Sequence, residues 1–169
     1  MPQMTEPMLN EFRQEADTTR RVLERIPADK LTWKPHPKSM SLGDLAMHTA
    51  SIPGRMGYVI TQQDRLEVNP EGFNPTPPKD LQQVHDTFEQ SCKDAEGFLQ
   101  GLSDQAAMSD WTLVVHGTPA FTLPRIAVLR SIMLNHWYHH RGQLSVYLRL
   151  LDVPVPVIYG RSADENPFA

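Results

Sequence analysis

The chain contains four stretches in which apolar residues recur at steps of three and four, and proline-rich segments separate these stretches. Such spacing places side chains on one face of an α-helix. Proline stops a helix because it lacks a backbone N–H, so the 15 prolines confine the helices to the segments between them. The pattern predicts an all-α protein built from amphipathic helices.

Polar residues mark where the first helices begin. The first helix is expected over residues 6–26, where a proline follows it. Ser41 and Asp44 form a capping pair at the start of a second helix, which Pro53 should kink or interrupt. Asp80 is expected to cap a third helix, which carries apolar residues along one face.

Two β-prone runs precede the last helix. Trp111–Val115 and Ala120–Leu123 flank a turn signal at residues 116–119, which indicates a small hairpin. We expect Thr122 to cap the last helix, which then continues to about Leu151, roughly 30 residues further on.

The remaining segments exclude helix because of their prolines. We expect loops at residues 27–40 and 69–79 and an extended tail after Asp152. No repeat or linker divides the chain. The predicted architecture is an up-down four-helix bundle with a small β-hairpin before the last helix, in a single domain over residues 1–169.

Composition excludes several functional classes. Sixteen basic against 20 acidic residues give a net charge of −4, which argues against a nucleic-acid partner. The single cysteine, Cys92, lies on a helical core stripe and excludes an internal disulfide. No apolar run approaches the ~20 residues of a membrane helix. The first residues lack a secretion signal, so we expect a cytoplasmic protein.

The last helix carries histidines in its apolar row. The row consists of Ile126, Leu129, Met133, His136, His140, Leu144, Tyr147 and Leu151. Burying an imidazole without a partner costs on the order of 1–3 kcal/mol, so two in one row need a joint reason. Residues four apart share a helix face, and the ring nitrogens of His136 and His140 can converge on one cation.

A third ligand comes from the second helix. His48 lies three residues after Leu45 and four before Ile52, so it also faces inward. Three histidines leave a coordination position for water or substrate, which is typical of catalytic rather than structural metal sites. His139 competes with His140 for this role because it shares a face with His136; we interpret it as a contact beside the site.

Candidates for supporting roles are fewer. No carboxylate is an obvious general base: Asp44 is occupied at a helix start, and Asp164 and Glu165 would have to fold back from the tail. Gln143 could donate or accept a hydrogen bond next to a ligand. Arg141 is interpreted as a contact to another helix or to the tail.

The segments WKPHPKSMSLGDLAMHTASIPG, FTLPRIAVLRSIMLNH and NHWYHHRGQLSVYLRLLDVPVPVIYGRSADE together span most of the chain and resemble DinB/YfiT-like proteins. The resemblance implies a four-helix bundle and a metal held by three histidines, which correspond to His48, His136 and His140. It also implies a divalent ion such as nickel, zinc, iron or manganese, and a homodimer. Characterised relatives include transferases and isomerases that use low-molecular-weight thiols.

Two functional hypotheses follow. The first is a metal-dependent enzyme acting on a small molecule, either a thiol-dependent S-transferase or a hydrolase. The second is a non-catalytic bundle that binds metal or another ligand in a stress response. An open position beside the metal that faces a pocket favours the enzyme; a fourth protein ligand or a sealed core favours the binding module.

Overall fold

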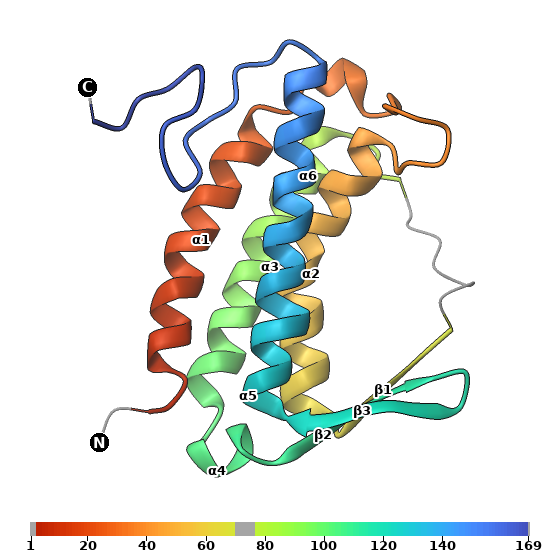
Figure 1. The fold of residues 1–169 in the computed structure, drawn as a ribbon, viewed down its shortest axis with the longest axis vertical. Helices are drawn as coiled ribbons and strands as arrows, with labels where there is room; N and C mark the ends of the chain where they lie inside the picture. The colour runs from red at the N-terminus through yellow and green to blue at the C-terminus, as the bar shows by residue number, and fades with distance from the viewer. Residues whose placement is uncertain (1–2, 70–76, 169) are drawn as a thin grey trace.

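Four long helices lie along a common axis in the computed structural model, which describes residues 3–69 and 77–168 (Figure 1). They are α1 (Glu6–Glu24), α2 (Leu42–Gln62), α3 (Leu81–Gly101) and α6 (His136–Leu150). Shorter pieces are a 3-10 turn (Ala28–Lys30), α4 (Asp104–Ala107), α5 (Arg125–Val128) and a π-helical segment (Leu129–Asn135). Most of the loop predicted at 69–79 lies outside the described residues. No described helix is long and apolar enough to cross a membrane.

The helix directions differ from strict up-down alternation. Gly54 lies against Ser91 and Gly57 against Ala95, so residue numbers rise together along α2 and α3 and the two helices are parallel. Figure 1 shows both running opposite to α1 and α6. The reason is the long connection between Gln63 and Asp80, since a chain of this length can span the roughly 30 Å of a 21-residue helix.

The predicted cap of α2 is confirmed, but the interruption expected at Pro53 is wrong. Pro53 lies inside a continuous helix. Its missing N–H leaves the carbonyl of Thr49 without its usual helix partner, and the indole Nε1 of Trp137 donates to that carbonyl at 3.0 Å. The next residue, Gly54, donates its N–H to the hydroxyl of Ser91 at 2.8 Å. Neighbouring helices therefore accommodate the proline.

A small sheet closes one end of the bundle. Its strands are β1 (Arg65–Val68), β2 (Asp110–Val115) and β3 (Thr118–Pro124), in the order β1-β2-β3. The β2–β3 hairpin confirms the prediction, and its turn residues His116 and Gly117 both have positive φ. Thr122 is not the helix cap: its hydroxyl lies 2.8 Å from that of Thr112 across the hairpin, and the helix begins after Pro124. The parallel strand β1 was not predicted.

Two buried side chains join the sheet end to α2. The indole of Trp111 donates to the carbonyl of Val59 at 3.3 Å. Arg125 donates to the carbonyls of Ile60 and Gln63 at 2.9 and 3.2 Å. The Ile60 carbonyl is among the last of α2, which have no partner within the helix, and Gln63 directly follows the helix, so Arg125 caps its C-terminal end.

The tail is extended, as predicted, and its carboxylates hold it together. Asp164 accepts from the backbone N–H of Val155 at 2.8 Å, and Glu165 accepts from that of Val157 at 2.9 Å. Glu165 also pairs with Arg25 at the end of α1. Both carboxylates are therefore engaged in anchoring the tail.

Candidate metal centre

Three histidine side chains converge between α2 and α6. Nε2 of His136 lies 3.3 Å from Nε2 of His48 and 3.1 Å from Nε2 of His140. The three candidate ligand atoms all lie within 4.8 Å of one another. Within residues 3–69 and 77–168, this is the one cluster of three His, Cys, Asp or Glu side chains that could hold a metal ion. The structure thus brings together the three residues singled out from the sequence.

The neighbours of the histidines fix how the two helices face each other. Thr49 follows His48 in the chain, and Trp137 follows His136. The hydrogen bond from the Trp137 indole to the Thr49 carbonyl therefore joins α2 and α6 directly behind the cluster. Trp137 is fully buried and stacks on Phe12 with ring centroids 5.4 Å apart. A packed aromatic core therefore holds the imidazoles in place.

The cluster lies at the edge of the core rather than inside it. His140 is 7% exposed, but His136 is exposed to solvent. The prediction of a single inward row is therefore wrong at His136, whose place in the core is taken by Trp137. The reason is the π-helical segment Leu129–Asn135, which has more residues per turn than an α-helix. Counting in steps of three and four across this segment therefore no longer identifies the side chain that faces the core.

The protonation states favour cation binding. Burial, together with the nearby His140, His136 and Arg55, lowers the pKa of His48 to about 4. Burial likewise lowers the pKa of His140 to about 4 and lowers the pKa of His136. Nδ1 of His140 lies 2.8 Å from the amide oxygen of Gln143. Since that oxygen only accepts, it places the proton on Nδ1 and leaves the lone pair on Nε2.

The spacing of the nitrogens fits a shared ion. Metal–nitrogen bonds of about 2.0–2.1 Å put neighbouring ligands about 3.3 Å apart in a tetrahedral site and about 2.9 Å apart in an octahedral one. The separations of 3.3 and 3.1 Å from His136 to His48 and His140 fall within this range. The residues present therefore fit a divalent cation held by three neutral imidazoles.

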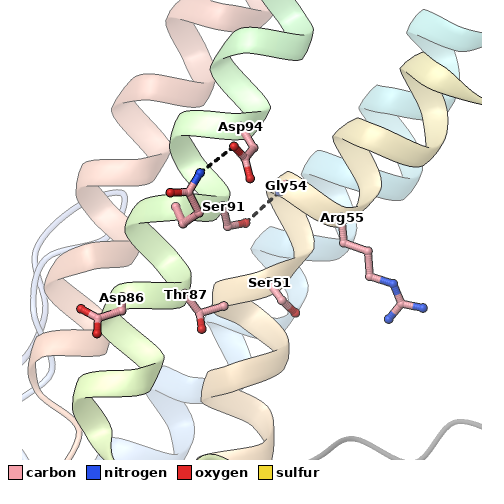
Figure 2. A pocket seen from close by; sticks show the side chains of 8 residues that line it. Ser51, Gly54, Arg55, Asp86, Thr87, Ser91 and Asp94 are labelled. Carbon is pink, nitrogen blue, oxygen red and sulfur yellow. Dashed lines mark hydrogen bonds between the residues drawn. The ribbon is translucent and has the colours of Figure 1, made fainter.

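A small cavity of about 40 Å³ adjoins the cluster. Its lining consists of His48, Ser51, Ile52, Arg55, Met56 and His136. A cavity needs about 10–15 Å³ on this measure to hold one water molecule, so there is room for water or for a small group of a ligand beside the imidazoles. A larger open cleft of about 490 Å³ lies between α2 and α3 (Figure 2), and Ser51 and Arg55 line both hollows.

Other residues considered from the sequence lie elsewhere. His139 is exposed and contacts the ring of His140, with centroids 5.0 Å apart, outside the cluster. Asp44 is held in the capping box of α2. The Tyr147 hydroxyl donates to the carbonyl of Met40 at 3.2 Å, so its polar end is bound to the backbone.

Arg55 was missed by the sequence reasoning. It follows His48 by seven residues, or about two helical turns, so it lies along the same face of α2. That spacing was the available signal. The spacing indicates a place beside the site only when the cavity next to His48 is known.

The fold and the cluster define a class of helical-bundle proteins that carry three histidines between the second and last long helices. The DinB family model matches residues 1–166, and the chain belongs to the DinB family. It is 27% identical over 166 residues to the uncharacterized protein YrdA of Bacillus subtilis (strain 168), covering 98% of this chain and 93% of YrdA.

Two solved structures share the fold. A DinB-like protein from Bacillus cereus ATCC 10987 aligns with a TM-score of 0.71 at 22% identity, covering 94% of this chain and 100% of that one. The DinB-like protein YjoA from Bacillus subtilis aligns with a TM-score of 0.68 at 20% identity, covering 93% of this chain and 100% of that one. At these identities the likeness concerns the fold.

Proposed function

We propose that this protein binds a divalent metal ion through His48, His136 and His140 and acts as a metal-dependent enzyme on a small molecule, as a thiol-dependent S-transferase or a hydrolase. One observation carries the proposal: Nε2 of His136 lies 3.3 Å from Nε2 of His48 and 3.1 Å from Nε2 of His140, beside a cavity of about 40 Å³. A bound divalent cation would supply Lewis-acid chemistry that lowers the pKa of a coordinated water or thiol.

The chain's own residues have separable roles in this proposal. The imidazoles bind the ion, and Gln143 orients His140 through its Nδ1. Ile52 and Met56 form an apolar part of the cavity wall, which limits the water around the reacting group. Imidazole suits several ions, so nickel, zinc, iron and manganese all remain candidates.

A second candidate function is a non-catalytic module that binds metal or a ligand in a stress response. One observation favours it: among the described residues that line the small cavity, none is a carboxylate that could act as a general base. An enzyme at this site would then depend on the substrate, or on water and the ion, for proton transfer.

The test begins with protein purified without an affinity tag. Elemental analysis should find close to one divalent ion per chain in the wild type and a large loss in His48→Ala. A screen of electrophiles with several cellular thiols, and of hydrolysable esters and amides, then separates the enzyme from the binding module. Stoichiometric metal with no turnover in either screen favours the module. Wild type without metal overturns the metal-dependent enzyme and leaves only a module that binds another ligand.

The proposal extends to the assembly and location of the protein. We propose a single domain over residues 1–169, a homodimer and a cytoplasmic location; the family resemblance supports the homodimer. Light scattering of the purified protein measures the dimer directly, and a mass of one chain, 19.2 kDa, would contradict it.

A further inference from the structure

Arg55 lies beside the histidine cluster. It is exposed, and it lines the small cavity together with His48 and His136. No hydrogen bond or ion pair engages its guanidinium within residues 3–69 and 77–168. Other arginines of the bundle are paired: Arg20 with Glu89, Arg130 with Glu11.

Two acidic residues line the larger cleft, but neither forms an ion pair with Arg55. Asp86 and Asp94 line the α3 wall, where each accepts from a glutamine of the same helix, Gln82 and Gln90, at 2.8 and 2.7 Å. Figure 2 shows the side chain of Arg55 extending away from both carboxylates. The guanidinium is therefore available to a molecule that enters from outside.

The positive charge at the cavity favours binding of an anion. Three neutral imidazoles do not reduce the charge of a divalent ion, and the described residues that line the cavity include no Asp or Glu. Arg55 adds a further positive charge at the same hollow. A positive surplus in a partly desolvated site favours anionic ligands. The planar fork of arginine matches carboxylate and phosphate oxygens in particular.

The two hollows give such a ligand room. Ser51 and Arg55 line both of them, so a molecule that reaches the imidazoles can pass over Arg55 toward the cleft between α2 and α3. The cleft floor is the close approach of Gly54 to Ser91, where a Cβ on Gly54 would lie 2.9 Å from the Ser91 backbone.

We propose that Arg55 binds the anionic oxygen group, a carboxylate or a phosphate, of a small ligand whose other end reaches the ion held by His48, His136 and His140. This inference rests on the proposed function, because it presupposes an ion at the cluster. It adds a substrate class, small anions, and a residue that selects them.

The experiment uses protein loaded with cobalt(II), whose visible absorption reports the ligands of the ion. Two probes, 3-mercaptopropionate and 3-mercaptopropanol, present the same thiol with and without a carboxylate. We expect the wild type to prefer the carboxylate probe by about tenfold or more. Arg55→Gln should abolish that preference and leave affinity for the neutral probe unchanged, and Arg55→Lys should keep part of it.

The controls separate the two proposals. Arg65→Gln removes the same charge from strand β1 and should behave as the wild type; an equal loss there would overturn direct contact with Arg55. Absence of cobalt bands in the wild type overturns the proposed function itself. Cobalt binding with equal affinity for both probes overturns the role of Arg55 alone.

Inorganic phosphate distinguishes the two anion chemistries. Phosphate at millimolar concentration should displace 3-mercaptopropionate from the wild type but not weaken 3-mercaptopropanol in Arg55→Gln if the site accepts phosphate. Displacement by acetate and not by phosphate assigns the site to carboxylates. Displacement of neither probe by either anion overturns the proposed anion site.

Discussion

Two adjacent residues of α6, His140 and Arg141, are both buried, and the protein surrounds them differently. Arg141 is 1% exposed and donates to the Thr19 hydroxyl and the Glu15 carbonyl at 3.2 Å each. It also pairs with the carboxylate of Glu15. His140, 7% exposed, faces other imidazoles and Gln143.

The difference separates a polar group whose partners are supplied by the fold from a candidate metal ligand. Arg141 has its donors matched by α1, and its guanidinium also lies over the rings of Tyr138 and Tyr159 at 5.1 and 5.0 Å. The nitrogen of His140 that faces the cluster meets another imidazole nitrogen, which is a weak arrangement until a cation lies between them. Buried polar groups with hydrogen-bond partners are satisfied within the fold, whereas polar groups that converge on one another are candidates for a binding site.

The largest expected effect on stability comes from Arg141→Ala. Removing the guanidinium breaks the ion pair with the Glu15 carboxylate, whose side chain is 13% exposed and which would keep only the hydrogen bond from the Tyr159 hydroxyl. Breaking a buried ion pair in this way costs about 3–5 kcal/mol. Chemical denaturation should therefore show a fall of this size in the unfolding free energy.

A matched variant tests whether burial is the cause. Arg130→Ala removes an arginine that pairs with Glu11 on a more exposed part of α1 and the last helix. Such a pair is worth about 0–1 kcal/mol. If Arg130→Ala and Arg141→Ala destabilise equally, the contrast drawn at Arg141 is wrong.

His48→Ala should show the opposite profile, with metal affinity lost and the fold kept. We expect affinity for the divalent ion to fall by more than about 100-fold, since even residues that only orient ligands contribute 10–100-fold. Helicity by circular dichroism should remain, because Trp137 and Thr49 still join the two helices. His139→Ala is the control and should bind metal stoichiometrically; a loss equal to that of His140→Ala would mean that His139 is a ligand.

Gln143→Ala tests the hydrogen bond that orients His140. The amide oxygen accepts from Nδ1 at 2.8 Å, and its removal frees the ring to rotate and to change tautomer. Metal affinity should fall by about 10–100-fold, with the stoichiometry unchanged. Gln82→Ala, on the exposed side of α3, provides the control and should leave affinity as in the wild type.

The sequence predicts the helices and the faces on which the histidines lie because both depend on local spacing. Features that depend on distant parts of the chain are not predicted in this way. Periodicity and caps are local, so Ser41, Asp44 and Asp80 identify where α2 and α3 begin, and the structure confirms them. Convergence of His48 with His136 and His140 follows from the faces of two helices. Strand β1 depends on pairing with a partner far along the chain, and four residues carry too little pattern to show it.

Local sequence pattern does not predict which side chains face the core after an irregular helical segment, nor where cavities form. After the π-helical segment Leu129–Asn135, Trp137 rather than His136 enters the core, and no single residue of the segment indicates this from the sequence. Pro53 is tolerated because Trp137 and Ser91, from two other helices, satisfy the backbone beside it. The same holds for Arg55, whose significance depends on a cavity assembled from two helices.

A last effect is expected from pH on the stability of the metal-free protein. Burial lowers the folded pKa of His48 and His140 to about 4, whereas an unfolded histidine titrates near about 6.5. Between these values the unfolded chain binds more protons than the folded one, so the unfolding free energy should fall as pH drops from about 6.5 to 4. Melting in a chelator at pH 7, 6 and 5 measures this slope, and His48→Gln should flatten it. If the unfolding free energy depends on pH equally in the wild type and the variant, the contrast with Arg141 is wrong, because His48 would then not be a buried imidazole held without its proton.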